Sequence, residues 1–143
     1  MSIVLGIDLG TSFSSVAAVR DDSIVVVEDD QGRQSMPSIV HFALSGRVDV
    51  GYQARPMVYL EPENTIHSCK RLLGRRFDDG AVRIARQAHL FEITDGPNHW
   101  PMIEARGGPY TVPEICACVL QELKSRAEAF FGETITKAVI TVP

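Results

Sequence analysis

The residues best suited to chemistry lie near the N-terminus, in the segment Gly6-Ile7-Asp8-Leu9-Gly10-Thr11-Ser12. An apolar, strand-like run is followed there by a carboxylate, a glycine and two hydroxyl side chains. Glycine lets backbone N–H groups approach a ligand closely, and successive N–H groups in a tight turn form an anion-binding concavity suited to phosphate. Asp8 is suited to hold a hydrated Mg²⁺, because this ion prefers a carboxylate together with several waters.

The same segment also fits a purely structural role. A tight hairpin between two strands requires glycine and small polar residues whether or not it binds a ligand. The segment is not a P-loop, because the pattern G-x-x-x-x-G-K-[ST] is absent and a strand, not a helix, is expected to follow. On the residues alone, phosphate binding and a structural turn both stay open.

Lys70 is the second candidate for chemistry. We expect a helix over residues 65–73, and Lys70 lies at the edge of its apolar stripe, which consists of Ile66, Cys69 and Leu73. A lysine in this position can extend its ammonium group to water along apolar neighbours. Alternatively, the ammonium is held against a transferring phosphate, where a fixed positive charge stabilises the transition state.

Cysteine and histidine do not suggest a metal centre. Cys116-x-Cys118 falls in a helical pattern, where residues two apart point to different faces, so small core thiols are the favoured interpretation. The four histidines are dispersed along the chain without the spacing of a metal site. Three cysteines, an odd number without framework spacing, favour a reducing compartment.

The elements that must position these residues follow from hydrophobic patterning. We expect strands at residues 3–8, 14–20, 24–28 and 38–44, the first of them buried on both faces, and a hairpin of residues 90–94 and 100–105. Thr111 and Glu114 form a capping box at the start of a helix that ends at Gly132. The expected buried stripe of this helix is Ile115, Val119, Leu123, Ala127 and Phe130.

A last apolar strand is expected at residues 137–142, with no later element to cover it. We therefore expect one α/β domain over residues 1–143 that is incomplete at its C-terminus. The net charge of −4 argues against non-specific nucleic-acid binding, which needs a basic surface. No signal-like N-terminus and no apolar stretch of about 20 residues is present, so we expect a cytoplasmic protein that binds no membrane.

Several segments together resemble the nucleotide-binding domain of the DnaK-like seventy-kilodalton heat-shock chaperones. The matching segments, in the family's order, are Gly6-Ile7-Asp8-Leu9-Gly10-Thr11, Met36-Pro37-Ser38-Ile39-Val40, Asn64-Thr65-Ile66, Lys70-Arg71-Leu72-Leu73-Gly74-Arg75-Arg76-Phe77 and Ala138-Val139-Ile140-Thr141-Val142-Pro143. The first is shared with actin and the sugar kinases, whereas the last two are distinctive of the chaperones.

The resemblance implies an α/β fold of the ribonuclease-H-like, actin-like ATPase type, with a mixed sheet and flanking helices. Residues 1–143 would then be the N-terminal portion, forming most of the first of two lobes. It implies that the parent protein binds and hydrolyses ATP to control the binding of unfolded client peptides. The implied partners are ATP or ADP with Mg²⁺, K⁺ as a further candidate ion, a J-domain co-chaperone and a nucleotide-exchange factor.

The resemblance also implies roles for individual residues. It assigns the ATP phosphates to Gly10, Thr11, Ser12 and Phe13. It makes Asp8 the carboxylate that reaches Mg²⁺ through water, and Lys70 the catalytic lysine near the γ-phosphate. The second phosphate loop, the other catalytic carboxylates, the adenosine-binding segment and the peptide-binding domain of the family would lie beyond this chain, so we expect residues 1–143 alone to be inactive.

The sequence departs from the family at three positions. Ser12 replaces the usual threonine, Phe13 the usual asparagine or tyrosine, and Pro56 lies in a segment that is helical in relatives. Residues 45–52, 66–74 and 101–104 are also similar to the branch specialised for iron–sulfur cluster assembly, so the subfamily stays open. A nucleotide-sensing module without turnover and a sugar-kinase-type enzyme of the same superfamily are the alternative functions.

Overall fold

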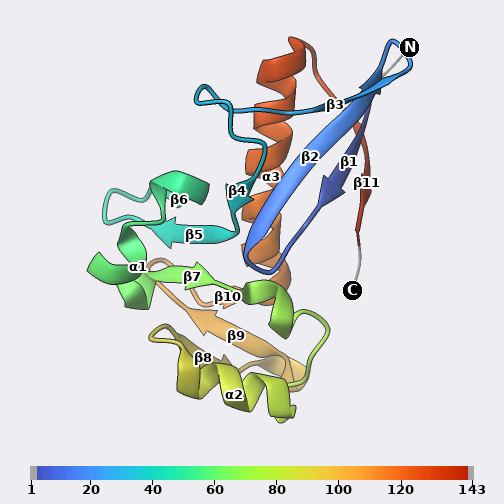
Figure 1. Ribbon diagram of the computed structural model, residues 1–143. Coiled ribbons are helices and arrows are strands. Elements are labelled where there is room, and N and C mark those ends of the chain that lie inside the picture. Colours follow the sequence, from blue (N-terminus) through green and yellow to red (C-terminus); the bar gives the residue numbers. More distant parts are fainter. Residues whose placement is uncertain (1–2, 142–143) are drawn as a thin grey trace.

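A twisted sheet forms one side of the molecule in the computed structural model, which describes residues 3–141 (Figure 1). Strands β1 (Val4–Asp8), β2 (Phe13–Arg20) and β3 (Ser23–Val26) form an antiparallel meander. Strand β11 (Lys137–Ile140) pairs with β1 in parallel, which makes the sheet mixed. The short β4 (Met36–Pro37) pairs with the start of β2. Val142, the last residue of the strand expected at 137–142, lies outside the described residues.

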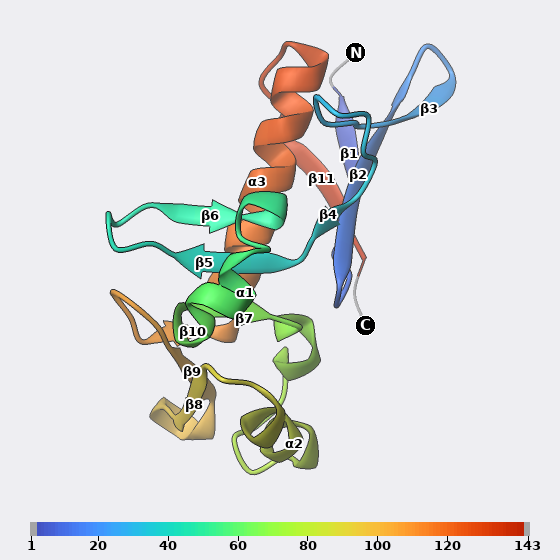
Figure 2. The same cartoon turned by 60° about the vertical axis from the view of Figure 1, so that its left-hand side comes forward.

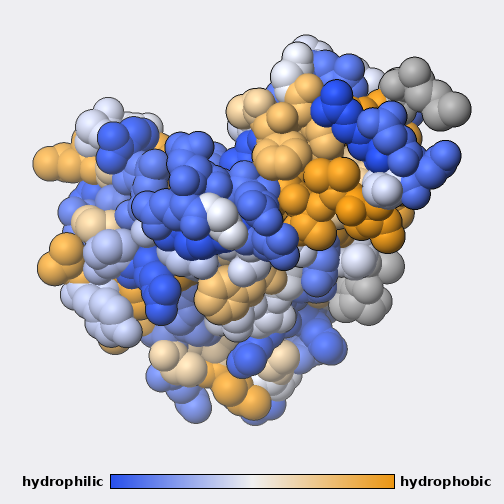
Figure 3. Space-filling model, turned by 45° about the horizontal axis from the view of Figure 1, so that its top comes forward, coloured by the Kyte–Doolittle hydropathy of each residue, from blue (hydrophilic) through white to orange (hydrophobic). Residues whose placement is uncertain are grey.

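The sheet has one covered and one open face. Leu5 and Ile7 of β1 are buried, whereas Val4 and Gly6 between them are exposed. The expectation that this strand is buried on both faces is therefore wrong, because the described residues cover only the side on which helix α3 (Val112–Phe131) lies. The open face carries further exposed apolar side chains, and apolar side chains gather on this side of the molecule in Figure 3. They are Val19, Ile24 and Val139.

Helix α3 (Val112–Phe131) is the longest element and packs against the sheet on one side and the smaller sheets on the other (Figure 2). Its capping box is present: the Glu114 carboxylate accepts from the Thr111 N–H at 2.6 Å, and the Glu114 N–H donates back to the Thr111 hydroxyl at 3.3 Å. Gly132, with φ of 73°, ends the helix as expected.

The expected stripe of α3 is right at four positions and wrong at the fifth. Ile115, Val119, Leu123 and Ala127 are buried. Phe130 is 46% exposed, and Phe131 takes the buried place at 9%. Steps of three and of four residues both return to the same helix face, and the four-residue step from Ala127 to Phe131 is the one that meets the core here.

The remaining elements form two small antiparallel sheets and several short helices. One sheet has the order β6-β5-β7 and the other β10-β9-β8, of which β8 and β9 are the expected hairpin. The bounds of the strands are β5 Ile39–Phe42, β6 Val48–Val50, β7 Thr65–His67, β8 Glu92–Asp95, β9 Pro101–Glu104 and β10 Tyr110–Thr111. The helices are η1 Gly51–Gln53, α1 Met57–Leu60, η2 Pro62–Asn64, η3 Cys69–Leu72, α2 Gly80–Ala88 and η4 Pro97–His99.

The helix expected over residues 65–73 is absent, and strand β7 followed by the 3₁₀ helix η3 takes its place. The β-branched Thr65 and Ile66 pair with His41 and Val40 of β5, so tertiary pairing outweighs the helical spacing of the apolar residues. Ser68 then adopts a left-handed conformation, φ 57°, which separates the strand from η3.

A polar network joins the sheet of β5 to the segments around it. His41 is buried and lies 3.3 Å from both Asp49 and Glu61, one on each ring nitrogen. Arg47 pairs with Asp49 at 2.6 Å, and Arg106 pairs with Glu61 at 2.8 Å. These contacts satisfy polar groups that would be costly to bury alone. No helix in the described part of the chain is long and apolar enough to cross a membrane.

Candidate functional site

The turn between β1 and β2 has a backbone conformation that only glycine permits at residue 10. A Cβ atom built on Gly10 would overlap the carbonyl oxygen of Phe13, and backbone atoms cannot give way as a flexible side chain can. The turn therefore folds back tightly on itself. This explains the glycine of the N-terminal motif by geometry, independently of any ligand.

Two buried serines form hydrogen bonds with this turn, and one of them, Ser38, also lines the groove beside it. The Gly10 N–H donates to the Ser14 hydroxyl at 3.1 Å, and the Ser38 hydroxyl donates to the Gly10 carbonyl at 2.8 Å. The Ser14 and Ser38 hydroxyl oxygens lie 2.8 Å apart. The Ser38 N–H donates to the Ser12 carbonyl at 2.9 Å. The sequence interpretation missed both serines, although a serine at an inward-facing strand position, as Ser14 is, marks a buried polar contact.

The front of the turn is free to bind a ligand. Within residues 3–141, no hydrogen bond uses the backbone N–H groups of Thr11 or Ser12. Ser12 is exposed and Thr11 is half-buried, so these donors and the two hydroxyls are accessible from outside. Adjacent unpaired N–H groups in a tight turn form a site for an anion, and this arrangement fits a phosphate group.

Asp8 lies at the end of β1, exposed, just before the turn. Its Oδ1 accepts a hydrogen bond from the Thr141 hydroxyl at 3.1 Å, and the Thr141 N–H donates to the Ile7 carbonyl at 3.0 Å. Its other oxygen accepts no hydrogen bond from the described residues. The carboxylate is therefore oriented by the residue after β11 and keeps an oxygen for water or a hydrated cation, which fits Mg²⁺.

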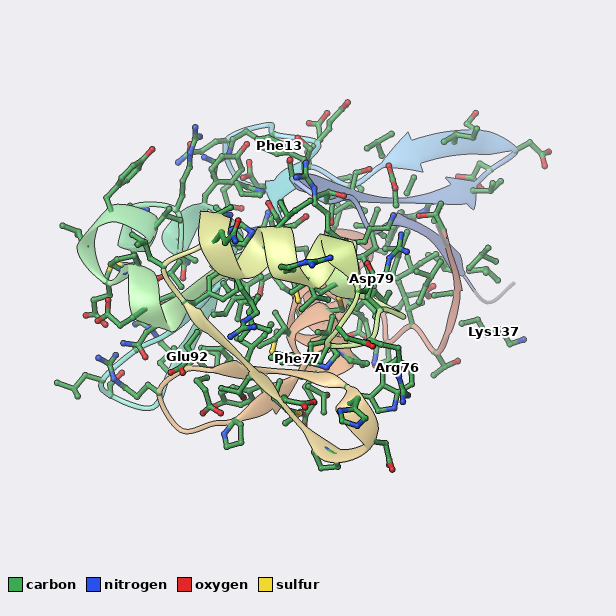
Figure 4. The ribbon with its side chains drawn as sticks, turned by 90° about the horizontal axis from the view of Figure 1, so that it is seen from below. Phe13, Arg76, Phe77, Asp79, Glu92 and Lys137 are labelled. Carbon is green, nitrogen blue, oxygen red and sulfur yellow. The ribbon has the colours of Figure 1, made fainter. Side chains whose placement is uncertain are left out.

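A groove of about 240 Å³ opens beside the turn. The turn and the start of β2 form one side, with Phe13 48% exposed and labelled in Figure 4. The opposite side comes from the region of α1 and from the end of β7, through Arg55, Val58, Tyr59, His67 and Ser68. Burial lowers the pKa of His67, so its ring is neutral at pH 7 and adds no charge to the groove.

Lys70 lies in η3, half-buried, two residues after Ser68. Figures 1 and 2 both show the β1–β2 turn beside η3. The structure thus brings the segment of Lys70 to the groove, although Lys70 is not itself among the lining residues. It forms no salt bridge with any described residue, which leaves its ammonium available.

The 3₁₀ helix η3 packs against α3, and cysteine thiols lie in this contact. Cys69 Sγ donates to the Val112 carbonyl at 3.9 Å. The neighbouring Cys69 thiol and the charge of Lys70 lower the pKa of the Cys116 thiol, although burial acts in the opposite direction. Cys118 differs from Cys116: it is half-buried, and its Sγ donates to the Glu114 carbonyl within α3. Cys116 and Cys118 therefore have different surroundings, as the helical spacing predicted.

A family described as Hsp70 protein matches residues 4–143, which include Asp8, the turn, Lys70 and β11. The chain belongs to the Hsp70 family. Members of the Hsp70 family are ATPases that bind ATP or ADP with Mg²⁺ and act as ATP-dependent chaperones. The family implies an actin-like ATPase fold, and the mixed sheet with α3 on one face agrees with it. The match confirms the family that the sequence resemblance indicated.

Proposed function

We propose that this chain forms the N-terminal portion, most of the first lobe, of the nucleotide-binding domain of a DnaK-like chaperone. In this proposal the whole protein binds and hydrolyses ATP to control its binding of unfolded client peptides. The observation that carries the proposal is the β1–β2 turn, which has a glycine-dependent bend, unpaired N–H groups on its front and a carboxylate at its edge.

The turn binds the phosphates of ATP in this proposal. The N–H groups of Thr11, Ser12 and Phe13 and the hydroxyls of Thr11 and Ser12 donate to phosphate oxygens, while Gly10 provides the bend. The backbone donors are fixed before the ligand arrives, so binding requires little reorganisation of the turn. The replacement of threonine by Ser12 keeps the hydroxyl, and Phe13 adds an apolar wall to the groove.

Asp8 holds Mg²⁺ through water in this proposal. Bound Mg²⁺ supplies positive charge that offsets the charge on the phosphate oxygens. The hydrogen bond from Thr141 orients the carboxylate and leaves its second oxygen to accept from a metal-bound water. Asp8 would hold the ion through water, and Mg²⁺, which gives up its water reluctantly, is suited to such a site.

Lys70 is the proposed catalytic residue. Its segment reaches the groove through Ser68, and no carboxylate among the described residues neutralises its ammonium group. A fixed cation near the γ-phosphate stabilises the charge that develops as the phosphoryl group is transferred to water. Lys70 lies just outside the groove lining, so a nucleotide-sensing module that binds ATP without turnover is the second candidate function.

Residues 1–143 alone neither bind ATP tightly nor hydrolyse it in this proposal. The donors of the turn are open to water, so a phosphate bound there must compete with solvent on every side that the chain does not cover. Tight binding requires a second lobe over the nucleotide. The same proposal includes a cytoplasmic location and two partner proteins, a J-domain co-chaperone and a nucleotide-exchange factor.

Single-turnover hydrolysis of ATP by the complete protein, with Mg²⁺, tests this function. We expect the wild type to hydrolyse bound ATP and Lys70→Ala to bind ATP but to lose at least about a hundredfold in rate. Arg71→Ala is the matched control, because Arg71 is the neighbouring cation and is exposed. Binding without turnover by the wild type would instead support the sensing module, and no binding at all would refute both.

A further inference from the structure

Ser38 contacts both ends of the segment that carries the free N–H groups. Its hydroxyl donates to the Gly10 carbonyl at 2.8 Å, and its N–H donates to the Ser12 carbonyl at 2.9 Å. Ser38 follows β4 and is 28 residues from Gly10 in the chain, so these contacts are tertiary. Ser38 and Ser14 are 8% and 1% exposed, which keeps water from replacing the bonds.

The geometry of the peptide group gives these two bonds a directional effect. In a planar trans peptide the C=O of one residue and the N–H of the next point in opposite directions. Fixing the carbonyl of Gly10 toward Ser38 therefore points the N–H of Thr11 away from Ser38. Fixing the carbonyl of Ser12 does the same for the N–H of Phe13. Ser38 thus directs two backbone donors to the side of the turn opposite its own.

Ser14 completes the arrangement from the other side. Its hydroxyl accepts from the Gly10 N–H at 3.1 Å and lies 2.8 Å from the Ser38 hydroxyl. Because the Ser38 proton goes to the Gly10 carbonyl, the Ser14 hydroxyl has a proton to donate to the Ser38 oxygen. The three hydrogen bonds therefore form a closed ring that begins and ends at Gly10, and the Gly10 N–H is already used within this ring. Gly10 is then a conformational residue, and it donates nothing to the ligand.

We propose that Ser38, supported by Ser14, is a positioning residue for phosphate binding that orients the N–H groups of Thr11 and Phe13 toward the nucleotide. This inference rests on the proposed function, since it assigns a new residue to the same site. A serine that merely filled a buried polar place would affect stability. A positioning serine also affects the part of the affinity that comes from the phosphates.

The test compares ATP, ADP and adenosine as ligands of the complete protein. We expect Ser38→Ala to weaken ATP and ADP binding about tenfold, as the loss of one or two well-placed hydrogen bonds would. Adenosine binding should stay within about twofold of the wild type, because adenosine has no phosphate that could contact the turn. Ser38→Thr, which keeps the hydroxyl, should restore most of the ATP affinity. Ser15→Ala is the control, since its hydroxyl forms no hydrogen bond with the described residues.

Each result separates the inference from the function beneath it. A wild type that binds no ATP refutes the proposed function itself. A wild type that binds ATP, with Ser38→Ala equally tight, overturns only the role of Ser38. An equal loss for adenosine, or a threonine variant as weak as the alanine variant, also overturns it. If Ser38→Ala does not fold, Ser38→Cys takes its place. The thiol is only slightly larger than the hydroxyl but donates poorly, so unchanged ATP affinity would again contradict the proposal.

Discussion

The imidazole of His67 meets that of His89 edge-on, with 4.6 Å between the ring centroids. His89 also stacks on Phe91 at 4.7 Å, and its Nδ1 is buried without a hydrogen-bond partner among the described residues. Burial lowers the pKa of both histidines, and the charge of Arg71, with that of His67 once it is protonated, lowers the pKa of His89 further. Both rings are therefore packed in their neutral form, and His67 lines the groove beside the β1–β2 turn.

Acidification should weaken this packing. The folded-state pKa of each histidine lies below the unfolded value of about 6.5, so the unfolded chain takes up more protons. The contribution of the two neutral histidines to stability is fully present above that pH. It falls as the pH drops through about 6.5 toward their pKa values in the folded state. We expect His89→Phe to reduce this fall and to raise stability at pH 7 by about 1 kcal/mol, because the unpartnered nitrogen is removed.

Urea unfolding between pH 7.5 and 5 checks this prediction, with His99→Gln as the control at an exposed histidine. An unchanged pH dependence in His89→Phe would show that the pair does not titrate with folding.

Arg106 should be the most costly arginine to replace. Its guanidinium donates to the Phe42 carbonyl at 2.7 Å and to the Glu61 carboxylate at 2.8 Å. Its backbone N–H donates to the side-chain oxygen of Asn64. Arg106→Met should destabilise the protein by about 1–2 kcal/mol through the loss of the guanidinium bonds. Arg20→Met, at an exposed arginine, should change stability by less than about 0.5 kcal/mol in denaturant titrations.

The same substitution should change the response to acid. The hydrogen bond from Arg106 holds the pKa of Glu61 below its ordinary value. Such a carboxylate contributes stability above its unfolded pKa, about 4, and loses that contribution as the pH falls through the lower folded value. In Arg106→Met we expect a shallower loss of stability between about pH 4.5 and 3 than in the wild type. A parallel loss in both proteins would refute the assignment.

Local patterns predicted the elements whose causes are local. The capping box of α3 lies within four residues, and the existence of β1 and β2 follows from the apolar and β-branched residues within each strand. The family, too, followed from short contiguous motifs. The tight turn after β1 is where the sequence indicated, because the backbone leaves no room for a side chain at residue 10. That this turn binds phosphate stays a prediction.

Predictions that depended on distant partners did less well. The apolar spacing of residues 65–73 fits a helix, but pairing of β7 with β5 is decided by a segment about 26 residues away. The burial of both faces of β1 depends on what covers the sheet, which no strand encodes in its own residues. Ser14 and Ser38 are 24 residues apart, so their contact could not be read from either neighbourhood. The position of Lys70 just outside the groove is likewise a tertiary outcome.

The C-terminal end of α3 offers a matched pair of neighbouring residues. Phe131 is 9% exposed and Phe130 is 46% exposed, with their rings 5.1 Å apart. Phe131→Ala should destabilise the protein by about 3–4 kcal/mol, because it removes a buried ring and leaves a cavity. Phe130→Ala should cost about 1 kcal/mol or less. Thermal or urea unfolding of the two variants measures their losses of stability. A larger loss in Phe130→Ala would contradict this prediction and favour Phe130 as the buried residue expected from the sequence.

Gly10→Ala should separate the phosphate turn from the rest of the fold. The new methyl group would overlap the Phe13 carbonyl, so the turn must open, whereas Ala at Gly6 would meet only the Ala17 carbonyl at 3.8 Å. We expect Gly10→Ala in the complete protein to abolish ATP binding and to destabilise the fold by about 1–3 kcal/mol, because backbone strain at a functional turn is of this order. Gly6→Ala, the control, should bind ATP as the wild type does. Calorimetric titration with ATP measures both, and undiminished binding by Gly10→Ala would show that the turn does not contact the nucleotide.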